Sequence, residues 1–453
     1  MSSATRKTVS FQTVGCRLNQ YETEKMAAAL YPYGFQRAAQ GEPVDLYIIN
    51  TCTVTHRADS TNRYLIQKAA RENPDARIVV AGCYVDSDAD VVAGLGPVDV
   101  VVSNEEKPRI VEILSEQLSD LFEGDPGAVE SVSPGAFERF NRAWLKISDG
   151  CNQRCSFCIL PQVRGRLRNR PPMEIVAEIR ELLALGFQEI VLTGVNIGHY
   201  KHRTTEPQVK NLAHLCRMIL EQTELPRLRL SSIEPQTVRE ELLRVCADSR
   251  GRICRHMHLP LQSGSSRLLR LMRRPYDRDI YLKRVADARS AQPNTIVGAD
   301  VIAGFPGETD EDFAQTVEVA EYGLIDYLHV FSYSDRPGTA ASEAADKISP
   351  ETIKERSAIL SAISDRLWAK AHARQVGETL GVIAEHVKPA RGVLYGIADN
   401  YINVKLSVDC ASGRRIQAVK ITSATKGYVE GEMISGINGA LGGHCLYPYP
   451  TRQ

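Results

Sequence analysis

Hydrophobic residues in the first hundred positions occur as short runs, rich in β-branched side chains, that alternate with longer amphipathic stretches. The runs at residues 8–15, 45–50 and 77–82 are separated by helical stretches such as 19–30. Short apolar runs of this kind are typical of buried strands, and their alternation with helices favours a parallel sheet with helices on both faces. The pattern predicts a parallel αβα domain over residues 7–118.

The same alternation resumes near residue 140 and continues for six strand–helix units. The stretch 174–185 shows how these helices are delimited, because Pro171 and Pro172 precede it and Gly186 follows it. Six consecutive units predict an open (βα)6 barrel over residues 140–370, related to the (βα)8 architecture. The six candidate strands are residues 143–148, 189–193, 227–232, 257–262, 296–302 and 327–333.

Beyond about residue 373 the pattern changes to short alternating runs separated by Gly-rich turns. Alternation of apolar and polar residues with a period of two is typical of antiparallel strands with one buried face. We therefore predict a small antiparallel β-barrel over residues 373–448. Residues 119–139, rich in Gly, Pro, Ser and acidic residues, are expected to form a linker. The predicted fold class is α/β with three parts.

Charge and composition narrow the possible functions. The chain has 55 basic and 55 acidic residues, so global charge gives no support for nucleic-acid binding, which must rest on local patches. No apolar run is long enough to cross a membrane, and the N-terminus lacks the apolar stretch of a signal peptide. We therefore expect a cytoplasmic protein without a membrane partner. Its 11 cysteines indicate metal binding or burial, because disulfides are rare in that compartment.

Three cysteines stand close together just after the first strand of the second series. Cys151, Cys155 and Cys158, here called the middle triple, have the spacing C-x3-C-x2-C. A structural zinc site normally closes with four ligands, and a fourth cysteine or histidine is missing nearby. A 4Fe–4S cluster held by three thiolates would instead leave one iron open for a substrate or cofactor. A zinc knuckle or a chance spacing is the alternative.

Three further cysteines lie at, or within two residues of, the ends of the N-terminal candidate strands. Cys16, Cys52 and Cys83, here called the N-terminal triple, occur in TVGC, IINTC and VAGC. The carboxyl ends of parallel strands converge on one edge of the sheet, so these thiols are expected to meet around one site. The alternative is that they are small buried residues. The remaining cysteines lack a ligand spacing and are predicted to be structural: Cys216, Cys246, Cys254, Cys410 and Cys445.

The middle triple, with Phe157 before its last cysteine, resembles the signature of the radical S-adenosylmethionine (SAM) superfamily. The resemblance implies that the open iron binds SAM and that an electron from the cluster cleaves SAM to a 5′-deoxyadenosyl radical. Further SAM contacts are expected at the carboxyl ends of the barrel strands, where such barrels place functional residues. The candidate cofactor-binding residues are Phe157, Thr193, Gly194, Asn196, Ser232, Glu234, Gln262, Asp300 and Gly304.

The two triples and the C-terminal barrel together resemble the methylthiotransferase family. Its three parts are an N-terminal methylthiotransferase domain, a radical SAM core and a TRAM domain, and the resemblance covers nearly the whole chain. The resemblance implies two 4Fe–4S clusters. The cluster on the middle triple makes the radical, and the cluster on the N-terminal triple holds the sulfur to be transferred. The motifs are GCRLNQYE, NTCTVT, AGCY, GCNQRCSFC, LTGVNIGHY, RLSSIEP, HLPLQSGS, DVIAGFPGET and FSYSDRPGTA.

Within the family, GCRLNQYE and NTCTVTHRAD most resemble enzymes that modify N6-threonylcarbamoyladenosine next to the tRNA anticodon, at position 37. The implied reaction inserts a methylthio group at adenine C2, giving 2-methylthio-N6-threonylcarbamoyladenosine. The C2–H bond is not acidic, so a radical suits it better than a base. Isopentenyladenosine in tRNA and an aspartate of a ribosomal protein are the alternative substrates. A metal-containing RNA-binding protein without turnover is the alternative of another class.

The same resemblance implies partners. The anticodon stem-loop of tRNA is the expected substrate, and a flavodoxin or ferredoxin is the expected kind of reductant, while the sulfur donor is left open. Basic groups are candidate RNA contacts, with solvated charged faces as the alternative. They are Arg164, Arg166, Arg168 and Arg170; Arg267, Arg270, Arg273, Arg274 and Arg278; and Lys388, Arg391, Lys405, Arg414 and Arg415, with Tyr395 and Tyr401 nearby. The histidines show no ligand spacing.

Overall fold

The structure, a computed structural model, describes residues 7–39, 41–122, 140–204, 206, 208–385, 394–406 and 413–434. Residues 123–139 of the predicted linker lie outside these ranges, as do Lys388, Arg391, Cys410 and Cys445. The chain forms two compact units. Unit 1 contains the described residues up to 122, Asp149–Leu167 and Ser334–Thr339, and unit 2 contains the others. The three domain ranges given above stay predictions.

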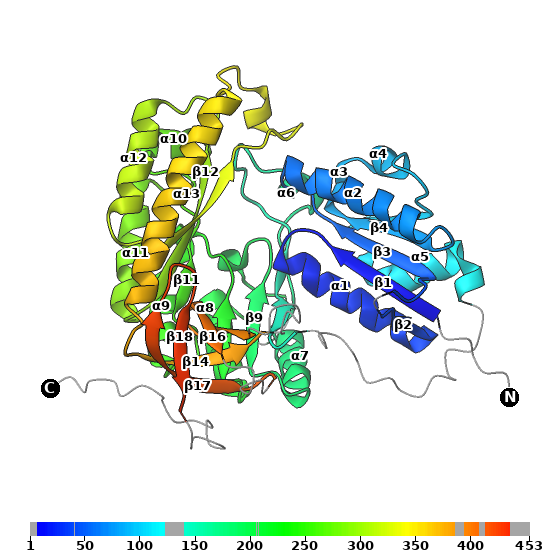
Figure 1. Ribbon diagram of the computed structural model, residues 1–453, viewed down its shortest axis with the longest axis horizontal. Coiled ribbons are helices and arrows are strands. Elements are labelled where there is room, and N and C mark those ends of the chain that lie inside the picture. Colours follow the sequence, from blue (N-terminus) through cyan, green and yellow to red (C-terminus); the bar gives the residue numbers. More distant parts are fainter. Residues whose placement is uncertain are drawn as a thin grey trace. The chain divides into compact units, whose positions relative to one another are not determined.

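Unit 1 is built on one parallel sheet with the strand order β2-β1-β3-β4-β5 (Figure 1). Apolar side chains of the sheet enter two cores, one beneath α1 and α5 and the other beneath α2. This arrangement confirms the predicted αβα architecture. The strands are β1 (Lys7–Thr13), β2 (Phe35–Arg37), β3 (Leu46–Thr51), β4 (Arg77–Gly82) and β5 (Val100–Val102). The helices are α1 (Arg17–Leu30), α2 (His56–Glu72), α3 (Cys83–Ser87), α4 (Ala89–Ala93), α5 (Ile110–Gln117) and, within the cysteine loop, α6 (Leu160–Val163).

Unit 2 contains six parallel strands in two three-stranded sheets, β10-β9-β6 and β11-β12-β13. A parallel bridge between Leu228 and Ile253 and a hydrogen bond from Ile233 N to His258 O (2.9 Å) connect the two sheets. The six strand–helix units form the predicted open barrel. The strands are β6 (Ala143–Lys146), β9 (Glu189–Thr193), β10 (Arg227–Leu230), β11 (His256–His258), β12 (Ile296–Ala303) and β13 (Tyr327–Ser332). Two-residue strands, β7 (Ser148–Asp149) and β8 (Arg168–Asn169), flank the cysteine loop in the sequence.

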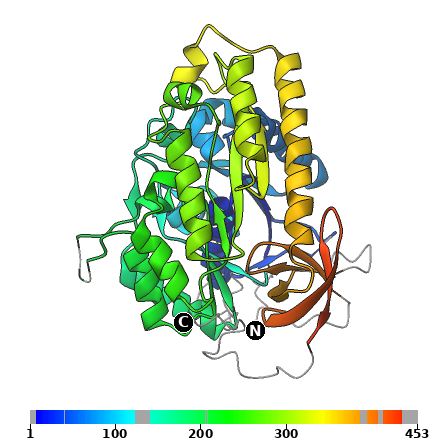
Figure 2. The same cartoon turned by 90° about the vertical axis from the view of Figure 1, so that its left-hand side faces the viewer.

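Helices of unit 2 cover the outer face of this barrel, as the view in Figure 2 shows. They are α7 (Pro172–Ala184), α8 (Leu212–Gln222), α9 (Glu240–Asp248), α10 (Ser266–Leu271), α11 (Arg278–Ala291), α12 (Asp310–Glu321) and α13 (Pro350–Ala373). The fourth strand of the (βα)6 barrel, β11, ends at His258 instead of the predicted residue 262. Pro260 lacks a backbone N–H, and Gln262 has a φ of 66°, so neither residue continues a regular ladder.

The C-terminal strands close into a barrel in the order β14-β15-β16-β18-β17. The predicted barrel is thereby confirmed, although its strands are not all antiparallel, because β16 pairs with β18 in parallel. Its core includes Ile296 and Tyr327 of the (βα)6 barrel and Ala371 of α13, so both barrels belong to one unit. The strands are β14 (Thr379–Ala384), β15 (Leu394–Ala398), β16 (Asn403–Leu406), β17 (Ile416–Ala424) and β18 (Val429–Met433).

A buried carboxylate lies where the two barrels of unit 2 join. Glu189 is fully buried and accepts hydrogen bonds from Arg227 and Arg229, the latter at 2.7 Å. Arg227 also donates to the carbonyl of Gly381 in β14 (2.6 Å). Burial would raise the pKa of Glu189, but the charges of Arg227, Arg229 and Arg142 outweigh it and hold that pKa well below its ordinary value. The ionised carboxylate therefore stabilises the joint between the barrels.

This joint predicts a pH dependence of stability. A carboxylate with a depressed folded-state pKa stabilises the fold above its unfolded pKa, about 4.3, and that contribution is lost as the pH falls towards the folded value. Glu189→Gln is expected to cost about 3–5 kcal/mol of unfolding free energy at neutral pH, because buried arginines lose their counter-charge. Urea unfolding between about pH 3 and pH 7 measures both effects. Glu240→Gln, at an exposed pair with Arg244, is the control and is expected to change stability by less than about 0.5 kcal/mol. An unchanged acid limb in Glu189→Gln would contradict the assignment.

Candidate functional site: two cysteine triples and a polar cluster

The N-terminal triple lies at the carboxyl ends of three neighbouring parallel strands. Cys16 caps α1 after β1, Cys52 follows β3 directly, and Cys83 opens α3 after β4. The strands are adjacent in the sheet, in the order β1-β3-β4, which brings the three thiols to one edge. Each of the other two thiols acts electrostatically on Cys52, as groups at one site do. The structure thus gathers the triple that the sequence predicted.

The backbone of Gly15 lies very close to the side chain of Cys52 in the N-terminal triple. Gly15 has a φ of +98°, and a Cβ there would lie 2.8 Å from Sγ of Cys52. Only glycine combines that conformation with that distance. The sulfur of Cys16 accepts a hydrogen bond from the backbone N–H of Asn19, and that of Cys52 accepts one from the backbone N–H of Val54. Burial raises the pKa of the Cys52 thiol to about 12, so its conversion to a thiolate requires a bound cation.

The middle triple lies in the Asp149–Leu167 loop of unit 1. The loop is folded back on itself, because Cys151 N donates to Gly165 O (3.1 Å) and Cys158 N donates to Cys155 O (3.2 Å). Gln153 N lies 3.4 Å from Sγ of Cys151. All three cysteines are half-buried, as is Phe157. The loop thus presents three thiols on a compact, hydrogen-bonded frame.

Arg164 connects this loop to the N-terminal triple within unit 1. Its Nε donates to Sγ of Cys83 (3.2 Å), and its other nitrogens donate to Glu22 (2.9 Å) and to Asn19 (2.6 Å). Burial would lower the pKa of Arg164, but Glu22 and the other anionic partners outweigh it and raise that pKa well above its ordinary value. Arg164 was predicted to contact RNA. That prediction is wrong, because the side chain is buried among these acceptors and cannot reach a phosphate.

Asn104 and Lys107 complete the network around Cys83. Asn104 Nδ2 lies 3.4 Å from Sγ of Cys83 and donates to the carbonyl of Val163 in the loop (3.0 Å). Lys107 Nζ donates to Asn104 (2.8 Å) and pairs with Glu22 (2.7 Å). Hydrogen bonds to cluster sulfurs help to set a reduction potential and orient the ligand. This network therefore positions one thiol of the N-terminal triple and anchors the middle triple's loop beside it.

Loss of Arg164 is expected to destabilise unit 1 strongly. Arg164→Met leaves Asp149 and part of Glu22 buried without a counter-charge, which costs about 3 kcal/mol or more. Urea unfolding followed by hydrogen exchange of the α1 amides measures the change. Arg166→Met, at an exposed position of the same loop, is the matched control and is expected to change stability by less than about 0.5 kcal/mol. Equal losses in the two variants would contradict the role given to Arg164.

Candidate SAM contacts at β9 and β10 lie where the sequence placed them. Thr193 ends β9 and Gly194 follows it, and a Cβ on Gly194 would lie 2.4 Å from Oγ of Ser148. Asn196 is buried, and its Oδ1 accepts a hydrogen bond from Nδ1 of His199 (2.9 Å). Beyond β10, Glu234 pairs with Arg274 and acts electrostatically on His199. The ends of these two strands thus share one polar network.

The remaining candidates lie on or after the next two strands. Gln262 is buried and donates its N–H to the carbonyl of Asp300 (2.7 Å). Gly304 directly follows β12 with a φ of +78°, and a Cβ there would lie 2.2 Å from Ile353 of α13. Asp300 was expected at a strand end, and this was wrong. It lies inside β12, because that strand runs on to Ala303.

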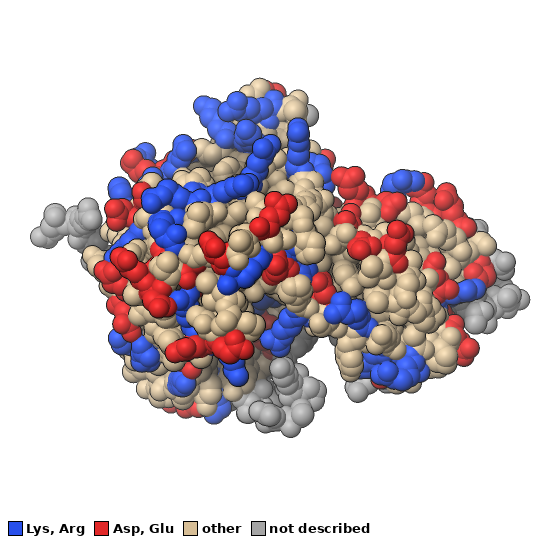
Figure 3. Space-filling view, turned by 90° about the horizontal axis from the view of Figure 1, so that it is seen from above, with Lys and Arg blue, Asp and Glu red and all other residues tan. Residues whose placement is uncertain are grey.

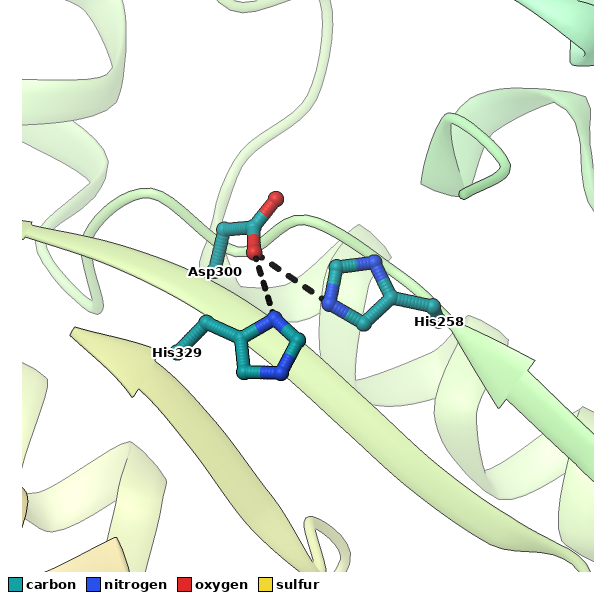
Figure 4. Close-up of side chains that lie close together, drawn as sticks. All are labelled: His258, Asp300 and His329. Carbon is teal, nitrogen blue, oxygen red and sulfur yellow. Dashed lines mark ion pairs between the residues drawn. The ribbon is translucent and has the colours of Figure 1, made fainter. Parts of the chain in front are cut away.

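Asp300 belongs to a polar cluster on three neighbouring strands, here called the His–Asp–His cluster. Its Oδ1 lies 3.2 Å from Nε2 of His258 on β11 and 3.4 Å from Nδ1 of His329 on β13. Figure 4 shows both rings turned towards this one carboxylate oxygen. Burial would raise the pKa of Asp300, but the two histidines outweigh it and hold the pKa below its ordinary value. Ser232 Oγ, another candidate, hydrogen-bonds to Nδ1 of His258 (2.7 Å).

The spacing of the ligand atoms distinguishes a cluster from a single ion. Among the described residues, the His–Asp–His cluster is the group of three His, Cys, Asp or Glu whose ligand atoms all lie within 4.8 Å of one another. Neither cysteine triple is that compact. Thiolates on one zinc ion lie about 3.8 Å apart, given Zn–S bonds of about 2.3 Å, whereas a four-iron cluster bonds each thiolate to a different iron. Both triples therefore fit a four-iron cluster better than zinc.

The basic groups proposed for RNA differ in their availability. In the second group, Arg267, Arg274 and Arg278 pair with Asp312, Glu234 and Glu318. Arg270 and Arg273 are exposed, and the described residues offer them no salt bridge. Figure 3 shows Lys and Arg side chains gathered on one part of unit 2, interspersed elsewhere with acidic ones.

The candidate RNA contacts of the C-terminal barrel also differ in whether their side chains are available. Tyr395 is 39% exposed, but Tyr401 stacks on His256 at a ring distance of 4.5 Å and is not available to a base. Lys405 pairs with Glu430 (2.7 Å). Arg414 donates to the carbonyl of Leu185 (2.6 Å). No helix among the described residues combines the length and hydropathy that a membrane crossing requires.

Sequence reasoning missed four features of these sites. The sequence pattern predicted only an RNA contact or a solvated charged face for Arg164, and it singled out neither Asn104 nor Lys107. Arg336 was quoted within a motif but not singled out, yet it is buried in unit 1 and donates to Asp59 (2.6 Å) and to the carbonyl of Thr53 beside Cys52 (2.9 Å). His329 is two positions from Tyr327 on one strand, and strand alternation could have placed it on the inner face.

Comparisons with known proteins agree with this geometry. The model of the radical SAM superfamily matches residues 145–320, and that of the uncharacterized protein family UPF0004 matches residues 8–103. The radical SAM methyltransferase TsrM from Kitasatospora setae has a similar fold, with a TM-score of 0.55 and 17% identity over 74% of this chain and 77% of that one. The barrel and the middle triple thus define a radical SAM protein.

Curated relatives narrow the class further. The threonylcarbamoyladenosine tRNA methylthiotransferase MtaB of Bacillus subtilis is 34% identical over 96% of this chain and 98% of that protein. The tRNA-2-methylthio-N(6)-dimethylallyladenosine synthase of Acidothermus cellulolyticus is also 34% identical, over 83% of this chain and 77% of that protein. The chain belongs to the tRNA methylthiotransferase family of radical SAM enzymes.

Proposed function

We propose that this enzyme inserts a methylthio group at C2 of N6-threonylcarbamoyladenosine at position 37 of tRNA, giving 2-methylthio-N6-threonylcarbamoyladenosine. The observation that carries the choice of nucleoside is the extent of the match. The chain spans 98% of the B. subtilis threonylcarbamoyladenosine enzyme but 77% of the A. cellulolyticus dimethylallyladenosine enzyme, at equal identity. Isopentenyladenosine is the second candidate, because dimethylallyladenosine synthases are also 33–34% identical to this chain.

The cofactors are two 4Fe–4S clusters and SAM, which when bound supply the radical and the sulfur. The middle triple would hold one cluster and the N-terminal triple the other. The protein's own part is to position them. Arg164 and Asn104 donate to Sγ of Cys83, and Gly15 allows Cys52 to approach. A carbon radical is needed because the C2–H bond offers no acidic proton, so the residues orient the reactants instead of acting as acids or bases.

Candidate SAM contacts in unit 2 would bind its polar ends. Glu234, held by Arg274, and Asn196, held by His199, are polar groups at the carboxyl ends of β10 and β9. Gly194 allows Ser148 to pack closely against the backbone next to Thr193. The anticodon stem-loop as the contact region, a flavodoxin or ferredoxin as reductant and the cytoplasm as location stay predictions.

Mass spectrometry of tRNA nucleosides tests the proposal. The tRNA comes from cells with and without this protein. We expect 2-methylthio-N6-threonylcarbamoyladenosine to disappear and N6-threonylcarbamoyladenosine to accumulate in the deleted cells. Loss of the methylthio isopentenyl nucleoside instead would keep the chemistry and overturn the choice of nucleoside. No change in any tRNA nucleoside, in cells that carry no second enzyme of this kind, would overturn the proposal.

A further inference from the structure

The inner face of the (βα)6 barrel carries the His–Asp–His cluster. Side chains alternate between the two faces of a strand, and Ala299 and Val301, on either side of Asp300 in β12, are fully buried beneath the helical layer. Asp300 therefore points to the opposite, inner face. His329 is the register partner of Asp300 on β13, so its side chain lies on the same face. The three residues thus form one polar patch inside the barrel.

Exposure increases from one side of the cluster to the other. The side chain of His258 is 9% exposed, that of Asp300 is 21% exposed, and that of His329 is 52% exposed. Phe331, two residues further along the same face of β13, is 43% exposed. A polar group that is anchored at its buried end and open at the other is suited to contact a ligand on the inner face.

Three of the four ring nitrogens of His258 and His329 face a polar partner within the cluster or Ser232, and the fourth, Nε2 of His329, does not. Nδ1 of His258 is held by Ser232, and its Nε2 faces Asp300. Nδ1 of His329 also faces Asp300, which turns Nε2 of that ring away from the carboxylate (Figure 4). Among the described residues, none forms a hydrogen bond with Nε2 of His329. A neutral imidazole accepts at one nitrogen and an imidazolium donates at both, so this atom can serve either a hydroxyl or a carboxylate.

The two kinds of curated relative differ in the substituent on adenosine N6. A dimethylallyl group is a hydrocarbon, whereas a threonylcarbamoyl group ends in a hydroxyl and a carboxylate. A hydrocarbon pressed against the cluster would desolvate His329 and Asp300 without replacing their hydrogen bonds to water, which is unfavourable. Sites built to hydrogen-bond a substrate group discriminate strongly against analogues that lack it.

We propose that the His–Asp–His cluster is the specificity site for the N6 substituent, where Nε2 of His329 hydrogen-bonds to the hydroxyl or carboxylate of the threonylcarbamoyl group. His258 and Asp300 act as positioning residues that fix the ring of His329. This inference rests on the proposed function and adds the residue that selects its substrate.

The same three ligand atoms are close enough to hold a divalent cation. A cation with only three protein ligands is of the open, catalytic type, which activates water or polarises a carbonyl. Hydrogen abstraction from a carbon atom uses neither effect. The geometry therefore favours a hydrogen-bonding site, and a metal ion is one of the outcomes that the experiment separates.

The test measures binding and turnover of RNA stem-loops that differ at a single nucleoside. Three stem-loops carry N6-threonylcarbamoyladenosine, isopentenyladenosine or adenosine at position 37. Binding to the holoenzyme is measured by fluorescence anisotropy, and the KM for SAM is measured separately. His329→Asn keeps a polar group near the position of Nδ1 but removes Nε2. His329→Gln has a longer side chain, so its amide lies nearer the position of Nε2. His214→Asn, on α8, is the matched control.

We expect His329→Asn to weaken binding of the threonylcarbamoyl stem-loop about 10- to 100-fold, as for loss of a hydrogen bond to a charged or polar group. Binding of the other two stem-loops and the KM for SAM should not change. His329→Gln should recover part of the loss, and His214→Asn should bind like the wild type. Equal weakening for all three stem-loops, or a raised KM for SAM, would overturn the proposal. So would one zinc ion per chain that Asp300→Asn removes.

The same measurements distinguish failure of the specificity site from failure of the proposed function. If the wild-type enzyme binds the threonylcarbamoyl stem-loop selectively through His329 but attaches no methylthio group to it, the specificity site stands and the proposed function fails. If the enzyme makes the expected product and His329→Asn makes it with unchanged KM and affinity, the function stands and the specificity site fails.

Discussion

Replacing Cys155 with alanine is expected to abolish the formation of 5′-deoxyadenosine from SAM and, with it, all methylthiolated tRNA. Cys155 is the central thiol of the C-x3-C-x2-C loop, and the described chain has no other cysteine in that loop besides Cys151 and Cys158. A cluster with two remaining thiolates loses an iron ligand. Iron content should therefore fall from about eight to about four atoms per chain, as for loss of one of two four-iron clusters. Liquid chromatography of the SAM products, with iron analysis, measures both effects.

A buried cysteine elsewhere provides the control for this experiment. Cys216 on α8 is fully buried near Cys246 of α9, and both are far in sequence from either triple. Cys216→Ala should retain full iron content and SAM cleavage, with a stability change typical of a small cavity. Retained SAM cleavage in Cys155→Ala would show that the radical-forming cluster is held elsewhere.

Cys52→Ala is expected to separate the two halves of the chemistry. SAM cleavage to 5′-deoxyadenosine should persist, because the middle triple is intact, while methylthio transfer to tRNA falls to background. The N-terminal triple gathers Cys16, Cys52 and Cys83 at one sheet edge, so loss of one thiol breaks that site alone. Iron content should again fall by about half. The assay compares 5′-deoxyadenosine with methylthiolated nucleoside in the same reaction.

Two results would contradict this assignment. Full product formation by Cys52→Ala would show that the N-terminal triple does not hold the transferred sulfur. Loss of SAM cleavage together with product would show that the two triples do not act separately. Cys246→Ala, which removes a buried thiol from α9, controls for nonspecific effects of a cysteine substitution. Burial raises the pKa of Cys246 to about 12, so that thiol is inert at neutral pH.

Much of the fold follows from local patterns. Short apolar runs and amphipathic stretches place β1, β3, β4 and most strands of the (βα)6 barrel within a residue or two of their observed bounds. The reason is that buried parallel strands are nearly continuous apolar segments, which leave a strong local signal. The exception is β11, where Pro260 and the left-handed conformation of Gln262 end the strand earlier than its apolar composition indicates.

The candidate sites were predictable where a rule of topology connects distant residues. Cys16, Cys52 and Cys83 are separated by tens of residues, yet each follows a parallel strand, and adjacent strand ends must lie on one edge. Arg164 obeys no such rule. It lies among arginines of similar spacing, and only the packing of its loop against Glu22 and Cys83 decides that it is buried while Arg166 is exposed.

The sequence by itself determined the order of strands and helices, the two cysteine triples and the family. These are encoded in periodicity, in turn residues and in short motifs, all of which act over a few positions. Tertiary structure decided which side chains meet: Arg164 with Cys83, and His258 with Asp300 and His329. Such contacts join residues from separate strands and loops, and their geometry depends on the packing of the intervening chain, which no local pattern records.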